Sequence, residues 1–360
     1  MKPRVVFVDP LMDARWNALV ESHPAAGTYH LAAWATVLRR AHGVKPRYLG
    51  LEGRDGRLEG GLPLMSSRGL VSGRRLRALP VLPTAGPIAG SREGELALVG
   101  AACELVHAEA ANVLIMRARR DGYETEIEGL LPVPQPPTWI VDLPDDPDEL
   151  RAIWRKRSKM LHRNIAKAER SGLVVREART EADLRRFYAL YLEAMRRHRS
   201  LPRPYSQVKL SHTLLGPSGR SKVFLVDHGA HTHAAGLFHR FGDTVDLLYN
   251  GSDTAGFALR ANNALYWHVL RWSIEEGVRR FDFGPAWPES SLGRFKSQWS
   301  AVQVPEYRYD YARKQAAQRM ESMRSVSHRL DEGEHPLVAL WDRVPTSLTR
   351  AAGAVAYRLL

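Results

Sequence analysis

The chain has 360 residues, of which 44% are hydrophobic, and its formal net charge is +13. A single cysteine, Cys103, excludes an internal disulfide, and the opening residues have no apolar core of a secretory signal. No apolar run reaches the roughly 20 residues that span a bilayer. We therefore expect a cytoplasmic protein of two domains. Any contact with a membrane would be peripheral, and the positive charge favours anionic partners.

The first part of the chain has the pattern of a mixed α/β unit. A small-residue loop over 84–90 precedes a long helix and a strand, which is the order of a crossover unit. The proline-rich segment 131–137 then breaks regular structure, and a linking strand follows it at 139–143. The elements predicted before that break are a strand over 4–8, helices over 15–21 and 32–41, hairpin arms over 47–52 and 57–64, a helix over 93–110 and a strand over 113–117.

The second part repeats this order of hairpin, loop, helix and strand. It begins with an acidic helix start at 145–148, which suits the positive end of a helix dipole. The elements predicted after it are a long basic helix to 171, a helix over 181–197, hairpin arms over 223–226 and 235–241, a strand over 245–249, a helix over 261–277, a strand over 280–285 and a turn over 294–299.

These patterns predict an α/β (α+β) protein with three regions. The first domain is expected over 1–138 and the second over 139–311, with the reactive crevice in the second. A helical tail is expected over 312–360. Its second half mixes apolar and basic residues, which suits either a membrane surface or packing against the domains, and packing is favoured.

The strand over 245–249 and the helix that follows it form the most informative part of the chain. Such a crossover creates a crevice where the strand ends and the helix begins. Backbone N–H groups and the positive helix terminus favour an anion at that point. Arg260, Asn262 and Asn263 cluster there and are predicted to bind substrate. Phe295 and Trp299, further along the chain, are predicted to bind substrate as well.

Three residues near this crevice are candidate catalytic groups. Lys296 lies between Phe295 and Trp299, and a fixed ammonium there would stabilise a developing oxyanion, whereas an ordinary surface lysine would not. Tyr249 is either a satisfied core tyrosine or a hydrogen-bond donor to the acyl carbonyl or the leaving group. Asp282 is either a general base or the partner of an arginine, and the structural role is favoured.

Residues 151–170 hold eight lysines or arginines and one acidic residue, Glu169. Arg155, Lys159, Arg163 and Lys167 recur every four residues, which aligns them on one helix face. Most such faces are solvated. This helix face has too few acidic residues to be stabilised by ion pairs within the helix, so a polyanion is the predicted partner.

The histidines give little support for a metal site. His231 and His233 are two residues apart in a predicted hairpin turn, and no third ligand is clustered with them. A solvated turn explains them better, and no metal is predicted.

Several short segments together resemble the Fem aminoacyltransferases and their acetyltransferase-like relatives. The resemblance covers about residues 5 to 311, and it implies two tandem domains of the acetyltransferase (GNAT) fold. Its most specific element is the Phe295-Lys296 pair. Residues 340–345 also resemble the tail of a subgroup linked to exported polysaccharides. The segments that carry the likeness are Tyr249-Asn-Gly-Ser252, Leu265-Tyr-Trp267, Arg280-Phe-Asp-Phe-Gly284 and Phe295-Lys-Ser-Gln-Trp299.

The resemblance implies transfer of an aminoacyl or acyl group to an amine of a peptidoglycan or exopolysaccharide precursor. The donor would be aminoacyl-tRNA or acyl-CoA, with no tightly bound cofactor. The partners would be an anionic glycan or nucleotide-sugar precursor and tRNA, and no DNA. Lys296 would stabilise the carbonyl oxygen, Tyr249 would serve the leaving group, Arg260 with Asn262 would hold a phosphate, and Arg203 with Tyr205 would line the acceptor channel.

Two differences from the family pattern leave both acyl donors, aminoacyl-tRNA and acyl-CoA, under consideration. The second part lacks the inserted coiled-coil arm common in relatives that use tRNA. It also lacks the Arg/Gln-x-x-Gly-x-Gly/Ala pattern that binds acetyl-CoA, for which residues 255–262 are a loose substitute. Two alternatives therefore remain: an acetyl-CoA-dependent N-acetyltransferase of small molecules, and a non-catalytic scaffold that binds polyanions or membranes.

Overall fold

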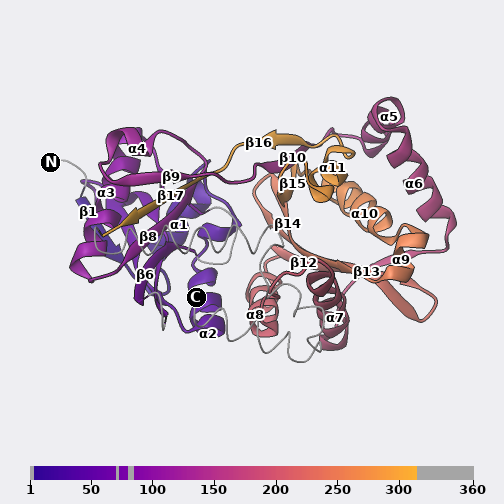
Figure 1. Ribbon diagram of the computed structural model, residues 1–360, viewed down its shortest axis with the longest axis horizontal. Coiled ribbons are helices and arrows are strands. Elements are labelled where there is room, and N and C mark those ends of the chain that lie inside the picture. Colours follow the sequence, from indigo (N-terminus) through magenta and orange to yellow (C-terminus); the bar gives the residue numbers. More distant parts are fainter. Residues whose placement is uncertain (1–3, 70–72, 80–84, 314–360) are drawn as a thin grey trace. The chain divides into compact units, whose positions relative to one another are not determined.

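The computed structural model describes residues 4–69, 73–79 and 85–313 (Figure 1). The described chain divides into two compact units, one formed by residues 4–135 with 306–313 and the other by 136–305. The predicted tail beyond residue 313, with the segment 340–345, lies outside the described residues. Each unit has its own sheets and core.

The first unit contains two sheets. Four strands form one in the order β1-β3-β4-β7, and six form the other in the order β2-β5-β6-β8-β17-β9. The only parallel pair recorded in the described part of this unit joins β6 and β8. The strands are β1 (Arg4–Val8), β2 (Lys45–Pro46), β3 (Tyr48–Glu52), β4 (Leu58–Leu62), β5 (Leu64–Gly69), β6 (Gly73–Ala78), β7 (Ile88–Ala89), β8 (Val113–Ala118), β9 (Leu130–Val133) and β17 (Tyr307–Ala312).

Helix α3 (Arg92–Ala108) supplies much of the first unit's core. It begins at Ser91, whose hydroxyl accepts the Gly94 N–H, and it lies against β3 and β4 of the four-stranded sheet and against β8 of the six-stranded sheet. Its buried residues form one core cluster with Leu51, Leu62 and Leu114. The other helices of this unit are α1 (Ala14–Ser22), the 3₁₀ turn η1 (Thr28–His30), α2 (Ala33–His42) and α4 (Tyr123–Glu126).

The strands β9 and β17 differ from the sequence expectation. Residues up to 311 were expected in the second domain, yet β17 pairs with β8 and β9 and buries Tyr309 in the first core. The proline-rich break was expected to begin at Leu131, but β9 runs through Pro132. Because β9 is an edge strand, the missing proline N–H is tolerated there.

The second unit has one seven-stranded sheet in the order β11-β12-β13-β14-β15-β10-β16. Strands β14 and β15 are parallel, as the strand–helix–strand prediction requires, and the other recorded pairs of this sheet are antiparallel. The strands are β10 (Thr138–Asp142), β11 (Val174–Glu177), β12 (Ser221–His228), β13 (His231–Phe241), β14 (Thr244–Ser252), β15 (Arg280–Pro285) and β16 (Val302–Val304).

Helices cover both faces of this sheet (Figure 1). One core cluster lies under α5, α6 and α10, and a second lies under α7 and α8. Within the described residues, no helix combines the length and apolar character that crossing a bilayer requires. The helices are α5 (Pro147–Arg157), α6 (Lys159–Arg170), α7 (Glu181–Arg197), α8 (Tyr205–Leu215), α9 (Thr254–Leu259), α10 (Ala261–Glu275) and α11 (Ser291–Ser297).

Two local predictions need correction. The long basic helix is broken at Ser158, whose backbone leaves the helical region at φ −139° and ψ 74°. The break gives two shorter helices, and each packs against α10 with its own buried residues, Trp154 from α5 and Ile165 from α6. The predicted turn that presents Lys296 is instead the short helix α11, which begins at Ser290 because its hydroxyl accepts the Gly293 N–H.

Candidate active site

The parallel strands β14 and β15 separate at the middle of the sheet. Their pairing covers Thr244–Asp246 against Arg280–Asp282, although β14 continues to Ser252 and β15 to Pro285. Beyond the last pair, the ladder between these two strands no longer uses their backbone N–H and C=O groups. A site with backbone donors and acceptors therefore begins where the strands diverge.

A β-bulge in β14 redirects Tyr249. Leu237 of β13 is opposite Tyr249 and Phe238 is opposite Leu247, so Leu248 is the extra residue. Leu247 packs on the cluster under α10, whereas Leu248 and Tyr249 pack on the cluster under α7 and α8. The bulge thus moves the phenol to the α7 and α8 face.

Tyr249 is held firmly on that face. Gln207 is fully buried, and its Nε2 donates to the Tyr249 hydroxyl at 2.7 Å. The Tyr191 and Tyr249 ring centroids are 5.2 Å apart. The hydrogen bond from Gln207 and the ring contact with Tyr191 together fix the position of the phenol.

The loop that carries Arg203 and Tyr205 is pinned to the same face. The Arg203 backbone donates to the Tyr191 hydroxyl at 2.9 Å and accepts from the Tyr188 hydroxyl at 2.8 Å. The Tyr205 hydroxyl donates to Glu181 at 2.8 Å. The structure therefore brings the predicted acceptor loop and Tyr249 to one side of the sheet.

Lys296 is a buried cation with a fixed orientation. Its side chain projects from α11, and the residue is 3% exposed. The Nζ donates to the carbonyl oxygens of Gly284 at 2.8 Å and Pro285 at 3.0 Å. Gly284 has φ +77°, which breaks the alternation of the strand so that two successive carbonyls reach one ammonium. The third N–H donor of this ammonium makes no hydrogen bond to the described residues.

The environment of Lys296 brings its ionisation close to neutral pH. Burial lowers the pKa of Lys296 to about 8, and the negative charge of Asp282 opposes this shift. Asp282 is itself 7% exposed and accepts from the Thr138 hydroxyl at 2.5 Å and from the Gly284 N–H at 2.7 Å. Lys296, Asp282 and the end of β15 therefore form one rigid group.

Phe295 and Trp299, predicted to bind substrate, belong to the hydrophobic core. Trp299 is fully buried, with its ring centroid 5.3 Å from that of Trp154. Phe295 is partly buried, with its ring centroid 5.7 Å from that of Tyr266. Both residues therefore pack in the core, and their packing holds α11, the helix that carries Lys296, in place.

The start of α10 has a polar surface. Arg260 precedes the helix in the left-handed region at φ 63°, and the Asn262 Nδ2 donates to the Ser252 hydroxyl at 3.1 Å. Arg197 donates to the Ser252 carbonyl oxygen at 3.1 Å. The Asn262 Oδ1 is buried without a hydrogen-bond partner, and Asn263 is 7% exposed. This helix start offers N–H groups and cations to an anion.

The predicted site residues therefore fall into three groups around the diverging strands. Lys296 and Asp282 lie together, Tyr249 lies with Arg203 and Tyr205, and Arg260 lies with Asn262. The segment that carries Lys296 packs on one face of the sheet and Tyr249 on the other. Gln207, Thr138 and Ser252, the polar partners that hold these groups, were not among the predicted site residues. No local pattern identifies them, since Thr138 is 144 positions from Asp282.

The histidine hairpin has another explanation. His233 Nδ1 lies 2.9 Å from Asp253, whose other oxygen accepts the Gly256 N–H and so begins α9. No set of three His, Cys, Asp or Glu side chains in the described residues has the arrangement of metal ligands.

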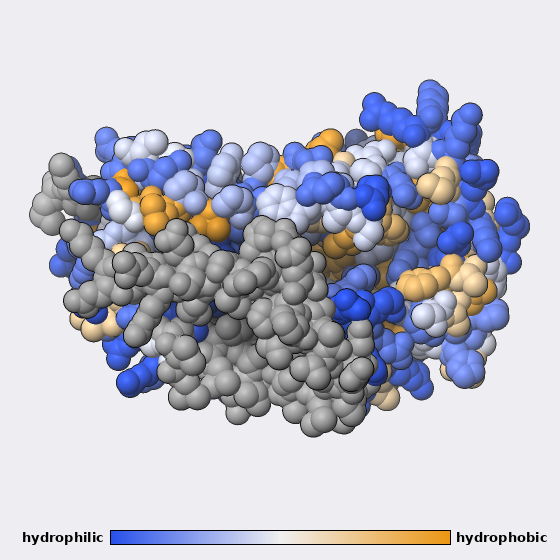
Figure 2. All heavy atoms as spheres, in the orientation of Figure 1, coloured by the Kyte–Doolittle hydropathy of each residue, from blue (hydrophilic) through white to orange (hydrophobic). Residues whose placement is uncertain are grey.

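The predicted polyanion-binding residues lie on two helices. Arg155 is on α5, while Lys159, Arg163 and Lys167 are on α6, and all four are exposed. Figure 2 shows a hydrophilic surface over these helices. We call these four residues the basic surface.

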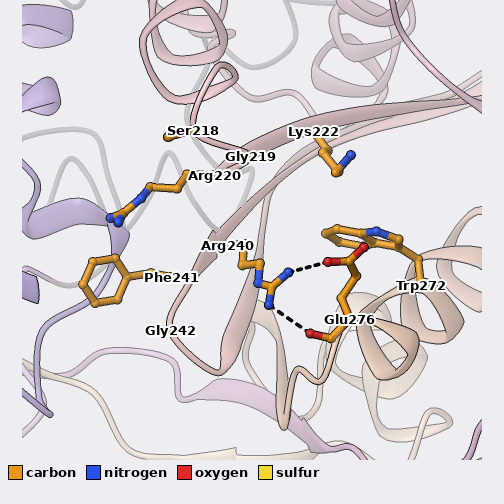
Figure 3. A pocket seen from close by; sticks show the side chains of 9 residues that line it. All are labelled: Ser218, Gly219, Arg220, Lys222, Arg240, Phe241, Gly242, Trp272 and Glu276. Atoms are coloured by element: carbon orange, nitrogen blue, oxygen red, sulfur yellow. Dashed lines mark hydrogen bonds and ion pairs between the residues drawn. The ribbon is translucent and has the colours of Figure 1, made fainter.

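A separate cavity of about 370 Å³ lies at the opposite end of α10 from its N-terminus (Figure 3). Two of its cations form ion pairs: Arg240 donates to the Glu276 carboxylate at 2.8 Å, and Lys222 donates to Glu177 at 2.9 Å. Trp272 lies under Lys222, with the Nζ 5.5 Å from its ring centroid. This cavity contains none of the predicted site residues.

Residues 155–297 match the family described as acetyltransferase (GNAT) domain. Most of the second unit therefore matches an acetyltransferase (GNAT) domain. That match spans every predicted catalytic residue, and it makes the chain an acyltransferase. No curated protein matched the sequence.

Solved structures extend the likeness to the whole fold. FemX has a TM-score of 0.70 at 16% identity, covering 88% of this chain and 99% of its own. The C-terminal domain of a putative lysylphosphatidylglycerol synthetase from Agrobacterium fabrum has a TM-score of 0.55 at 16% identity, covering 91% and 98%. A tandem GNAT protein from the clavulanic acid biosynthesis pathway has a TM-score of 0.52 at 12% identity, covering 86% and 98%. The resemblance to the Fem-type fold and the tandem α/β architecture are thus confirmed.

Proposed function

We propose that this acyltransferase forms an amide by transferring an aminoacyl or acyl group to an amine of a cell-envelope precursor, a peptidoglycan or exopolysaccharide intermediate. The observation that carries the proposal is the buried, doubly anchored ammonium of Lys296 at the end of β15. The likeness to FemX supports the choice of acceptor class.

In the proposed reaction, the neutral acceptor amine attacks the carbonyl carbon of a bound acyl ester or thioester. A C–N bond forms, the C–O or C–S bond breaks, and the amine proton leaves with the departing group or solvent. The free N–H of Lys296 stabilises the negative charge on the carbonyl oxygen, and its two backbone carbonyl partners keep it in place before the reaction.

The remaining groups have supporting roles in this proposal. Asp282 keeps Lys296 charged, because a neighbouring carboxylate favours the ammonium. Tyr249 and the loop of Arg203 and Tyr205 contact the acceptor or the leaving group. The start of α10, with Arg260 and Asn262, holds a phosphate of the donor or acceptor.

The test is product formation followed by mass spectrometry. The purified chain is given aminoacyl-tRNA or acetyl-CoA as donor and an amine-bearing nucleotide-sugar precursor or a panel of small amines as acceptor. Product from aminoacyl-tRNA and the nucleotide sugar supports the proposal. Product from acetyl-CoA and small amines alone would assign the chain to small-molecule N-acetyltransferases, which the family match of residues 155–297 equally permits.

The basic surface is proposed to contact the tRNA or the anionic glycan. Substitution of Lys159, Arg163 and Lys167 by glutamine should weaken tRNA binding and reduce its salt dependence, because fewer counterions are released. Arg57→Gln, on an exposed hairpin of the first unit, is the control. If the triple variant loses binding while catalysis is undetectable with every donor, the non-catalytic scaffold becomes the better description.

A further inference from the structure

The cavity beside Trp272 lies outside the candidate active site. Its volume of about 370 Å³ falls within the range of roughly 300–1,000 Å³ that is typical of small-molecule sites. It is lined by Lys222 of β12, by Arg240 and Phe241 of β13, and by Trp272 and Glu276 from the C-terminal end of α10. Figure 3 shows Lys222, Trp272 and the Arg240–Glu276 pair on one side of the cavity and Phe241 on the other. The cavity therefore combines cations with aromatic rings.

Arg240 is held against the end of α10 but keeps donors for a ligand. Its Nη1 donates to the Glu276 carboxylate at 2.8 Å, and its Nη2 donates to the Glu276 backbone carbonyl at 2.9 Å. A guanidinium carries five N–H donors, so three remain after these two bonds. None of the three has a hydrogen-bond partner among the described residues. The helix end thus fixes the position of Arg240 in advance and leaves its other donors to a ligand.

Lys222 is arranged in a similar way. Its Nζ donates to Glu177 at 2.9 Å, and the other two N–H groups of this ammonium have no hydrogen-bond partner in the part of the chain that the structure describes. The same Nζ lies 5.5 Å from the centroid of the Trp272 ring, so the ammonium and the indole adjoin. Lys222 and Arg240 are both partly exposed, so a ligand from solvent reaches them.

Trp272 supplies the apolar surface of the cavity. Its ring packs on the core cluster under α10, with its centroid 5.6 Å from that of Phe224, and the residue is only partly buried. The core thus fixes the indole and leaves part of it open to the cavity. On the other side, Arg220 covers Phe241, with its Cζ 5.3 Å from the ring centroid. The open part of the indole suits an aromatic ring, which packs on it in an offset-stacked or edge-to-face arrangement.

We propose that this cavity binds a small aromatic carboxylate. The N–H donors that Lys222 and Arg240 retain require acceptor oxygens, and a carboxylate forms charge-assisted hydrogen bonds with both groups. Glu177 and Glu276 already pair with these cations, so a ligand with one negative charge meets less repulsion than one with two. The ring of the ligand packs on Trp272. The site is independent of the acyl transfer proposed above, because Lys296 and the other predicted site residues lie outside the cavity.

Isothermal titration tests the proposal with three probes: benzoate, acetate, which lacks the ring, and benzamide, which lacks the charge. We expect benzoate to bind the unsubstituted chain at least tenfold more tightly than either of the others. Lys222→Gln should weaken benzoate binding at least tenfold. The matched control is Lys209→Gln, which removes an ion pair to Glu181 at 3.1 Å outside the cavity and should leave the affinity unchanged. No saturable binding of benzoate, equal affinities for the three probes, or an unaltered affinity in Lys222→Gln would overturn the proposal.

Thermal unfolding supplies the second readout and tests the role of the ring. Benzoate should raise the melting temperature of the unsubstituted chain beyond the effect of acetate at equal concentration. Trp272→Leu keeps an apolar side chain against Phe224 but removes the indole, and it should reduce the benzoate effect to that of acetate. An unaltered benzoate effect in this variant would contradict the proposal, and if the variant does not fold, the titration of Lys222→Gln decides. Lys296→Met should retain the benzoate effect, which separates this site from acyl transfer.

Discussion

Lys296 in the second unit and Arg77 in the first are both cations removed from water, but their surroundings are opposite. Lys296 donates to two backbone carbonyls and feels the carboxylate of Asp282, so the fold itself supplies acceptors for the charge. Arg77 has three arginines among its strongest charged neighbours, and its Nε has no acceptor. The backbone and a carboxylate therefore stabilise the charge of Lys296, whereas the charged neighbours of Arg77 are mostly cations.

The sharpest way to break this comparison is to remove the ammonium of Lys296. Lys296→Met keeps the volume of the side chain and should lower the turnover of acyl transfer by about 10²–10³-fold, the usual loss when one donor to a developing oxyanion is deleted. Single-turnover rates provide the measurement. Arg294→Ala, an exposed residue of the same helix, should retain full activity. Full turnover in Lys296→Met would remove the lysine from the mechanism.

The protonation state of Lys296 should make the rate of acyl transfer depend on pH in a predictable direction. If the ammonium stabilises the oxyanion, the rate falls about tenfold per pH unit above the pKa of about 8. Lys296→Arg, which stays charged, should lack this decline. A rate that rises through pH 8 and needs the neutral amine would instead make Lys296 a general base.

The same shift predicts a change in stability. The pKa of Lys296 is lowered from 10.5 to about 8 on folding, so the unfolded chain binds this proton more tightly. The free energy of unfolding should therefore rise with pH between 8 and 10.5, by on the order of 3 kcal/mol relative to Lys296→Met. Urea unfolding of both chains across this window is the measurement. Parallel pH profiles would contradict the predicted burial of a charged lysine.

Asp282 should depend on Thr138 for its position. Thr138→Val removes the hydroxyl that donates to the carboxylate at 2.5 Å and leaves a buried acceptor less satisfied. We expect a loss of about 1–3 kcal/mol in the free energy of unfolding, measured by chemical denaturation. Thr244→Val, whose hydroxyl contacts an exposed aspartate, is the matched control and should change stability little.

The smallest effect is expected in the cavity beside Trp272. Arg240→Gln removes an ion pair whose side chains are 31% and 49% exposed. Such solvated pairs contribute about 0.2–1 kcal/mol, so the melting temperature should barely move. A large loss would mean that this pair, like Lys296, is held in a low-dielectric setting.

The elements with strong patterns were predictable from local sequence. The apolar stripe and the capping residue Thr180 define α7, whose predicted bounds 181–197 match the structure. The Phe-Lys pair identified Lys296 as a candidate before any geometry was known. The break at Ser158 was not predictable, because the apolar positions on both sides continue a single helical stripe and only packing on α10 separates the two helices.

Periodicity and side-chain type are local properties, so they were enough to predict the α/β class, the crossover around α10 and the residues available for chemistry. Which of these residues meet depends on the tertiary fold. The bulge at Leu248 turned Tyr249 away from the face of α11, Gly284 aimed two carbonyls at Lys296, and β17 brought Arg308 beside Arg117 from nearly 200 positions away. Such contacts depend on strand register and backbone direction over long separations, which no local pattern encodes.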